Sequence, residues 1–514
     1  MLLARRLLTK EIYQKAIDNG VNIFLYNEIN FTPQPQEGIS LVNCTTERVP
    51  STWYTWKQNE AVFERFKHKF PQFFKWENYD MSLAFQKGLF WSNQKTGFLQ
   101  YVKNKDFSDQ RVWAEDLLYT TKFSHVFLRY YYLLIKSRSD GSNLKQVDKN
   151  GKTGFLLKNE FEVTLYKYLI THSIEDEKVI YFVLDEIVTD ALLKLGVKKE
   201  QILSCNNTKH RRMPFINFML LNSTQRYILN QVVNNWHEVE HWTGVAESIV
   251  SSGVSKILIN EGENGLIGAT LGEVFHKHGV VSYNTMNGMK AGQAQDTYIN
   301  FDYWFVWDDK MKQLLMDKNK LPASKLIVSG HLMEDEARDY QFHNSLPISL
   351  EEMQGKKVIS LFSVRGRREE KLKAFDYLYN LAELNEDIIF LIRSHPSEDI
   401  ADTIPPPEAL KNVFKVDYTD ENSKITLYDQ LSVSNLSICF GSTVAMESKW
   451  FGVPCITYEK RNESLIYLTD DSIIFHVKNK DEFIQKVHDL ISVKKKEKLQ
   501  LKKVADSILE TLLQ

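Results

Sequence analysis

The residues best suited to chemistry in this chain lie at the turn Gly441-Ser442-Thr443. An apolar run over 436–440 predicts a buried strand before the turn, and a short helix is expected after it. Backbone N–H groups and two hydroxyls at a helix N-terminus favour an anion, because the helix dipole places partial positive charge there. Glu447, on the first turns of this helix, adds a carboxylate for sugar or ribose hydroxyls. The group indicates a nucleotide-sugar pocket, and the alternative for the turn alone is an ordinary capped strand–helix connection.

An arginine-rich loop follows another predicted strand of the same half. The stretch 357–363 predicts the strand, and Arg365 and Arg367 flank a glycine directly after it. Guanidinium groups bind diphosphates well, because their planar N–H groups form paired hydrogen bonds with phosphate oxygens. A donor diphosphate is one interpretation of this loop, and a solvated basic turn is the other.

A third loop of this half combines Arg393, at the end of the predicted strand 388–393, with His395. An imidazole here could donate to the phosphate of a leaving nucleotide and act as a general acid. Because the carboxyl ends of parallel strands meet at one edge of a sheet, we predict that the three loops form one donor site. A single loop histidine is more often structural, and this is the alternative.

The first half of the chain carries carboxylates and amides after two predicted strands. Glu261 and Glu263 follow the strand 256–260, and either could be the general base for an acceptor hydroxyl or the nucleophile of a retaining displacement. Asn284 and Asn287 follow the next strand and supply polar groups on the acceptor side. The alternative for both glutamates is a favourable interaction with the positive end of the following helix.

The stretch His237-Glu238-Val239-Glu240-His241 matches the zinc-protease pattern H-E-x-x-H on a predicted helix. Its two histidines would share one helix face, and Glu238 could act as the base. A five-residue pattern also arises by chance in a long chain, and the sequence around it predicts alternating strands and helices. A zinc metallopeptidase is therefore the alternative from another reaction class, and the leading interpretation involves no bound metal.

Composition limits the remaining possibilities. A chain of 514 residues exceeds one hydrophobic core and predicts two or more domains. A net charge of −2 gives no indication of a nucleic-acid surface, and the four cysteines show no metal-ligand spacing. No apolar run reaches the ~18 residues of a membrane-spanning helix. The stretch 1–6 is too short for the hydrophobic region of a signal peptide. We expect a cytoplasmic protein, with peripheral association at the inner face of the plasma membrane left open.

Strands alternate with helices along both halves of the chain, which predicts parallel sheets built from βαβ units. The polar segment 331–356 is expected to be an interdomain linker. We predict an α/β fold with an N-terminal, acceptor-side domain over 1–335 and a C-terminal, nucleotide-sugar-binding domain over 336–514. The first includes an aromatic-rich helical insertion at about 52–150, whose aromatic side chains at helical spacing predict a core. An aromatic surface for a membrane or an acceptor is the alternative.

Two stretches of the second half, IRSHP at 392–396 and the segment 423–458, resemble bacterial capsule and surface-polysaccharide glycosyltransferases of the GT-B type. The segments 303–307 and 325–330 resemble the part that leads out of the N-terminal domain in that family. The resemblance covers roughly 255–480 and includes the His-Pro and Ser/Thr-pair motifs shared with sialyl-, Kdo- and polyglycerolphosphate transferases. It implies two Rossmann-like domains with parallel sheets facing a central cleft.

By this resemblance, His395 and the pair Ser442-Thr443 contact the donor, and Glu261 or Glu263 acts in catalysis. One departure concerns the acceptor side. Many capsule-type relatives carry Gln-His-Gly after the strand at 280–283, whereas this chain has Asn287-Gly288 without the histidine.

The sequence thus predicts a metal-independent glycosyltransferase without a cofactor. It would move a sugar from a CMP-, CDP-, UDP- or GDP-linked donor to a glycan or lipid-linked glycan of the bacterial surface, such as capsule or the O-antigen of lipopolysaccharide. Transfer of a polyol phosphate from a CDP-glycerol-type donor is the alternative within transferases. A non-catalytic sugar-nucleotide sensor is an alternative from a third class of function. The sequence names neither the sugar nor the acceptor, the stereochemical outcome or the oligomeric state.

Overall fold

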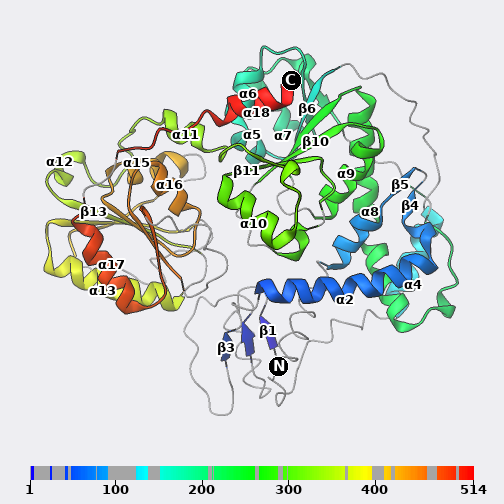
Figure 1. The fold of residues 1–514 in the computed structure, drawn as a ribbon, viewed down its shortest axis with the longest axis horizontal. Helices are drawn as coiled ribbons and strands as arrows, with labels where there is room; N and C mark the ends of the chain where they lie inside the picture. The colour runs from blue at the N-terminus through cyan, green and yellow to red at the C-terminus, as the bar shows by residue number, and fades with distance from the viewer. Residues whose placement is uncertain are drawn as a thin grey trace. The chain divides into compact units, whose positions relative to one another are not determined.

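The structure is a computed structural model that describes most of the chain. The described residues are 2–4, 23–25, 41–43, 48–76, 78–90, 123–136, 151–205, 211, 213–260, 265–286, 293–297, 299–364, 368–395, 410–417, 423–459, 472–493 and 497–514. They divide into two compact units (Figure 1). We call the described residues between 48 and 332, together with 503–514, the first domain. The second domain is 333–502 with three short strands that form a parallel sheet of their own, β1 (Leu2–Ala4), β2 (Ile23–Leu25) and β3 (Leu41–Asn43).

The first domain is built on a parallel sheet of seven strands in the order β12-β11-β10-β9-β6-β7-β8. Its strands are β6 (Thr153–Leu157), β7 (Val179–Val183), β8 (Ile202–Ser204), β9 (Lys256–Ile259), β10 (Val281–Thr285), β11 (Tyr303–Val306) and β12 (Leu326–Val328). Every position of β6 and β7 is buried, as expected for strands covered by helices on both faces. The chain builds outward from β6 to β8 and then continues at β9 on the other side of β6, so the strand order reverses between β6 and β9.

Helices cover both faces of this sheet. The helices α8 (Ser223–Ser251) and α9 (Leu266–Lys277) share one core with Ile257 and Ile259 of β9. On the opposite face lie α5 (Glu160–Leu165) and α6 (Lys167–Ser173), where the hydroxyls of Ser173 and Tyr181 are 2.8 Å apart. Side-chain oxygens that accept the first free backbone N–H groups begin several of these helices, as Asn159 does for α5, Asp185 for α7 (Glu186–Lys194) and Asp308 for α10 (Asp309–Asn319).

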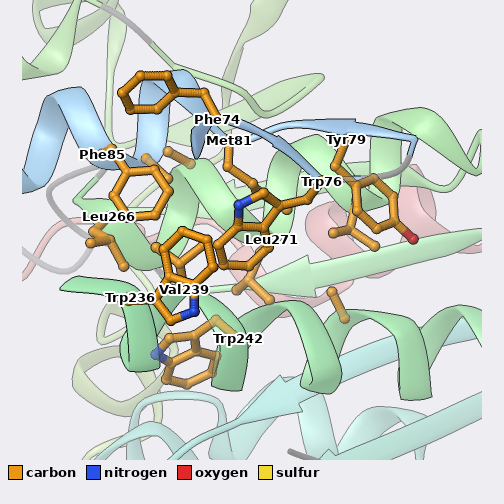
Figure 2. Close-up of a cluster of buried hydrophobic side chains, with 14 of the residues drawn as sticks. Phe74, Trp76, Tyr79, Met81, Phe85, Trp236, Val239, Trp242, Leu266 and Leu271 are labelled. Atoms are coloured by element: carbon orange, nitrogen blue, oxygen red, sulfur yellow. The ribbon is translucent and has the colours of Figure 1, made fainter. Parts of the chain in front are cut away.

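The aromatic side chains of the predicted insertion form part of this core (Figure 2). They come from α2 (Arg48–Lys69), the 3-10 turn η2 (Pro71–Phe73), the small hairpin β4 (Lys75–Trp76) and β5 (Tyr79–Asp80), the helical residues 82–90, and α4 (Phe123–Lys136). In Figure 2 the rings of Trp76 and Phe85 lie beside Trp236 of α8, at centroid distances of 4.6 and 5.9 Å. The prediction that these aromatics are core residues is confirmed for Phe63, Phe66, Phe73, Phe74 and Trp76, which are buried, whereas Tyr132 of α4 is 54% exposed.

The C-terminal helix α18 (Val504–Leu513) belongs to the first domain, although the sequence-based division assigned all of 336–514 to the second. Its last turn is fixed to the amino ends of two central strands. Lys256 Nζ and Thr153 Oγ1 donate to the carbonyl oxygen of Leu512 at 2.9 and 3.2 Å. A cation at this end also interacts favourably with the helix dipole. The spacing of the apolar residues predicts this helix, and the sheet on which it packs is a tertiary property.

The second domain contains a parallel sheet of six strands in the order β15-β14-β13-β16-β17-β18. These are β13 (Lys357–Phe362), β14 (Ile388–Arg393), β15 (Val413–Lys415), β16 (Leu436–Cys439), β17 (Cys455–Tyr458) and β18 (Ile474–Val477). The main helices are α13 (Arg368–Leu384), α15 (Ser423–Val433), α16 (Val444–Trp450) and α17 (Lys480–Ile491). Here the strand order reverses between β13 and β16.

The prediction of an interdomain linker over 331–356 is wrong for most of that segment. It contains α11 (Glu334–Asp339) and α12 (Leu350–Met353), and its middle is tied to α15. The buried carboxylate of Asp429 accepts the backbone N–H groups of His343 and Ser345 at 2.8 and 2.6 Å. The sequence analysis could not detect this anchor, because Asp429 lies more than eighty residues further along the chain.

The predicted α/β class with two parallel-sheet domains is confirmed. The cleft between the domains stays a prediction. Within the described ranges, no helix is both long and apolar enough to cross a membrane.

Candidate functional site

The carboxyl edge of the second sheet carries the described residues of the predicted donor site. β16 pairs with β13 in parallel register, and β14, which ends at Arg393, lies on the other side of β13. The chain leaves β16 through Gly441, whose φ of 80° is a backbone conformation that glycine adopts without strain. Ser442 and Thr443 follow at this point, directly beside the reversal of strand order. Open α/β sheets bind their ligands at such a point, outside the carboxyl ends of the strands.

The two hydroxyls of this turn differ in their use. Ser442 Oγ accepts the backbone N–H of Val444 at 3.3 Å, so it supports the turn itself. Thr443 stands at the N-cap position of α16, is exposed, and makes no capping hydrogen bond with its side chain. Because α16 is a helix of seven residues, its dipole is small, and the side-chain groups matter more than the predicted helix end. Thr443 is the hydroxyl that is open to a ligand.

Two buried carboxylates lie close to this edge. Glu447, which the sequence analysis singled out, is on α16 and only 5% exposed. Glu459 follows β17 directly and is fully buried, with its backbone N–H bonded to Val477 O at 3.0 Å. The sequence analysis missed Glu459. Its signal was available, because it is the first residue after a predicted strand next to the Gly441 turn.

The two predicted site residues at the end of β14, Arg393 and His395, differ in burial. Arg393 is the last residue of β14 and is buried, and its Nη1 donates to Thr426 Oγ1 on α15 at 2.6 Å. The structure therefore gives Arg393 a contact within the domain. His395 lies two residues further and is half-buried. Of the two, His395 has the more accessible side chain.

Five predicted site residues lie outside the described residues: Arg365, Arg367, Glu261, Glu263 and Asn287. Asn284 is described and is fully buried in β10, opposite Ile259 of β9. It lies within the sheet, so any contact with an acceptor would require a residue nearer the edge.

The carboxyl edge of the first sheet holds a polar cluster that the sequence analysis did not single out. Lys158 is the first residue after β6, and its Nζ donates to the backbone carbonyl of Asn260, the first residue after β9, at 2.8 Å. The same Nζ lies 3.1 Å from Glu162 Oε1, and Glu162 Oε2 accepts the backbone N–H of Lys158 at 2.7 Å. The ion pair could have been recognised in the sequence, because Lys158 and Glu162 are four residues apart directly after a strand. The contact of Lys158 with Asn260, on the other side of the strand-order reversal, could not have been recognised there.

The H-E-x-x-H stretch lies on α8. His237 Nδ1 is 3.0 Å from Oε2 of the buried Glu240, whose other oxygen accepts the backbone N–H of Arg211. In this stretch the carboxylate of Glu240 links α8 to Arg211. Across the part of the chain that the structure describes, no group of three or more His, Cys, Asp or Glu side chains is arranged to hold a metal ion.

Comparisons with known proteins give structural similarity alone. No protein-family model matches the chain, and no curated protein sequence does. The UDP-GlcNAc 2-epimerase from Methanocaldococcus jannaschii aligns at 13% identity and a TM-score of 0.49, covering 70% of this chain and 99% of that chain. The UDP-GlcNAc 2-epimerase from Neisseria meningitidis, bound to UDP-GlcNAc, aligns at 12% identity and a TM-score of 0.47, covering 70% of this chain and 99% of that chain. The glycotransferase of kitacinnamycin aligns at 11% identity and a TM-score of 0.44, covering 71% of this chain and 95% of that chain.

Proposed function

We propose that this chain is a GT-B glycosyltransferase that transfers a sugar from a nucleotide-sugar donor to a glycan of the bacterial surface. The observation that carries the proposal is the reversal of strand order between β13 and β16, with the Ser442-Thr443 turn leaving β16 at that point. A crevice at such a reversal accepts a nucleotide with its phosphates against the following turn. The same sheet edge also carries His395, Glu447 and Glu459.

In this proposal the donor is held by groups of different charge. Thr443 donates to a phosphate oxygen, and His395 donates to the phosphate of the leaving nucleotide, which stabilises its growing negative charge. Arg365 and Arg367, which enter from the sequence alone, hold the diphosphate. Glu447 or Glu459 accepts from ribose or sugar hydroxyls.

Catalysis is assigned to the first domain. Glu261 or Glu263 follows β9 and deprotonates the acceptor hydroxyl. Asn260, directly before them, has its backbone carbonyl held by Lys158 at 2.8 Å. This contact supports a fixed starting point for the segment that carries the base.

A thermal-shift screen of the full chain against CMP, CDP, UDP, GDP and zinc tests the proposal. A ligand that binds only the folded chain raises the melting temperature by mass action, by an amount set by its concentration and Kd. A nucleotide that raises it is then supplied as its sugar derivatives, including UDP-GlcNAc, and turnover is followed by release of the free nucleotide. Substitution of both Glu261 and Glu263 by Gln should abolish release while the thermal shift persists.

The outcomes separate this proposal from its alternatives. A phosphodiester in the product indicates polyol-phosphate transfer from the same donor site. Nucleotide binding without turnover, with function retained after substitution of both glutamates, indicates a sensor. A shift with zinc alone, lost in His237→Ala, indicates the zinc hydrolase and contradicts the proposal.

A further inference from the structure

Two buried cysteines lie side by side on neighbouring strands of the second sheet. The parallel register pairs Ser437 of β16 with Cys455 of β17, and Cys439 with Thr457. Cys439 and Cys455 are therefore diagonal neighbours on one face of the sheet, and their sulfur atoms are 3.8 Å apart. Both thiols are free and fully buried. A free cysteine packs like a small apolar residue, so core packing is the alternative to a chemistry that the two thiols share.

The face that carries the pair lies under α16, the helix that follows the turn at Gly441. Ser437 Oγ donates to Ser448 Oγ on α16 at 2.9 Å, which identifies this face. Cys439 is the last residue of β16, and the chain turns two residues later. The N–H of Gly441 donates to Thr457 Oγ1 at 3.2 Å, so the turn is tied to the residue opposite Cys439. A displacement of Cys439 is therefore passed directly to the turn.

The two thiols have different environments. A hydrogen bond from the Cys455 thiol, and further hydrogen bonds from the backbone N–H groups of Ser442 and Gly441, lower the pKa of Cys439 in spite of its burial. Burial and the hydrogen bond to Cys439 raise the pKa of Cys455. Because the thiolate is the reactive form of cysteine, Cys439 is the nucleophile of the pair and Cys455 is its neutral partner.

Burial limits the oxidants that can reach the pair. Both cysteines are fully buried, but Ser442, whose N–H donates to the Cys439 sulfur, is only partly buried, and Thr443 is exposed. A small local opening of this turn is enough to admit hydrogen peroxide. A tripeptide disulfide such as oxidised glutathione needs a much larger opening. Hydrogen peroxide is therefore the oxidant that matches this position.

We propose that Cys439 and Cys455 are a thiol-oxidation site, which hydrogen peroxide converts into a reversible disulfide at the base of the Ser442-Thr443 turn. The Cys439 thiolate attacks one peroxide oxygen and becomes a sulfenic acid, while the O–O bond breaks and the other oxygen leaves as water with the proton of that thiol. The Cys455 sulfur then attacks the sulfenic sulfur. The S–S bond forms, the S–O bond breaks, and the hydroxyl leaves as a second water with the Cys455 proton. The two sulfur atoms lose the two electrons that the peroxide gains.

Closing this bond should disturb the turn. A disulfide brings its sulfur atoms to about 2 Å, well inside the present 3.8 Å, and diagonal neighbours are farther apart than direct cross-strand partners. The end of β16 therefore has to move toward β17. A disulfide sulfur is also a weaker acceptor than a thiolate for the N–H groups of Ser442 and Gly441. We expect the displaced turn to bind phosphate less well, and this consequence, unlike the disulfide itself, rests on the proposed function.

Peptide mass spectrometry of the full chain tests the site. The protein is treated with hydrogen peroxide or with oxidised glutathione and then unfolded, and its remaining thiols are blocked with N-ethylmaleimide. Peroxide should join the peptides of Cys439 and Cys455 with the loss of a hydrogen from each, and dithiothreitol should separate them. Glutathione should leave both thiols free. The buried Cys205, whose pKa burial raises to about 12, is the internal control and should stay reduced.

Two variants test the order of the steps. In Cys455→Ala, the peroxide-treated Cys439 should stop at the sulfenic acid, which dimedone traps, and in Cys439→Ala, Cys455 should stay reduced. Oxidation of Cys455 in the latter variant would contradict the order. Where a variant fails to fold, the cross-link in the wild type still decides. Absence of that cross-link, or equal oxidation of Cys205, would overturn the proposal and leave the pair as core packing.

Nucleotide binding is measured separately on the oxidised and the reduced protein. Oxidation should weaken the affinity about tenfold, the effect of one lost hydrogen bond to a charged group, and dithiothreitol should restore it. A cross-link without a change in affinity would overturn the coupling to the turn and support the oxidation site alone. A cross-linked protein that binds no nucleotide in either state would contradict the proposed function instead, so the two failures are distinguishable.

Discussion

Lys158 Nζ donates a hydrogen bond of 2.8 Å to the backbone carbonyl of Asn260, and this contact joins the ends of the two central strands of the first sheet. The ammonium group also faces the buried Glu162 carboxylate at 3.1 Å. The contact fixes the chain immediately before the segment to which we assign the general base. It therefore links the stability of the first domain to the proposed chemistry.

Removing one member of this pair should destabilise the fold more than removing both. Lys158→Met removes the ammonium group that lies 3.1 Å from the buried carboxylate of Glu162, and breaking a buried ion pair by removing one partner typically costs about 3–5 kcal/mol. The double variant Lys158→Met/Glu162→Gln leaves no uncompensated charge and should recover a large part of that loss. Urea unfolding of the four proteins of the double-mutant cycle measures the coupling. If the effects of the two substitutions are additive, the ion pair makes no measurable contribution to the free energy of unfolding.

The Asp429 carboxylate should anchor the segment before β13. It accepts backbone N–H groups from His343 and Ser345 and a hydrogen bond from the Tyr340 hydroxyl. Asp429→Asn replaces one accepting carboxylate oxygen by an amide NH₂ group, which cannot accept a hydrogen bond from a backbone N–H. We therefore expect a loss of about 2–3 kcal/mol in the free energy of unfolding. Tyr340→Phe is the matched control, since it removes one partner only and should cost about 1 kcal/mol. Equal losses in both variants would contradict this role for the carboxylate.

The C-terminal helix should contribute to the stability of the first domain. Ile508 on α18 is fully buried, and Ile→Ala substitutions in cores cost about 2–5 kcal/mol. Ile508→Ala should therefore lower the melting temperature clearly, whereas the exposed Ser507→Ala on the same helix should leave it nearly unchanged. If the two variants melt alike, α18 does not pack on the first sheet in solution.

Acid should destabilise the first domain partly through His278. Burial lowers the pKa of His278 below its ordinary value of 6.5, and its Nε2 lies 2.8 Å from the Tyr79 hydroxyl. The lowered pKa means that the unfolded chain binds the proton more readily. The associated stability is complete above about pH 6.5 and is lost as the pH falls through the folded-state pKa.

His278→Gln should remove this part of the acid sensitivity. Melting temperatures measured between about pH 7 and about pH 5 should fall less steeply in the variant than in the wild type. His276→Gln, at an exposed histidine of α9, is the control. Identical pH profiles for wild type and His278→Gln would refute the assignment.

The alternation of strands and helices was enough to predict both parallel sheets, because buried parallel strands are continuous apolar runs such as VIYFV at 179–183. The order of the strands could not be predicted in the same way. It depends on the side to which each crossover returns, and the reversals at β6/β9 and β13/β16 appear only in the folded sheet. The partner of α18 and the anchor of 340–345 were missed for a related reason. Lys256 and Asp429 are ordinary charged residues until distant backbone groups reach them.

The same limit applies to the site. Ser442, Thr443 and His395 could be singled out because each follows an apolar strand within a few residues, and Glu447 because it lies on the helix after the turn. Glu459 follows a strand as well, but no motif distinguishes it. Cys439 and Cys455 are separated along the chain, and the 3.8 Å between their sulfur atoms is not visible in the sequence.

The central claim is that a nucleotide binds at the Ser442-Thr443 turn, and calorimetric titration tests it most directly. The nucleotide that gives the largest thermal shift is titrated into the wild type, the Ser442→Ala/Thr443→Ala variant and Ser507→Ala as a distant control. The account predicts a weakening of about 1.5–3 kcal/mol in the double variant, as for a lost hydrogen bond to a charged group, and no change in the control. Unchanged affinity in the double variant, or no nucleotide binding to the wild type, would contradict it.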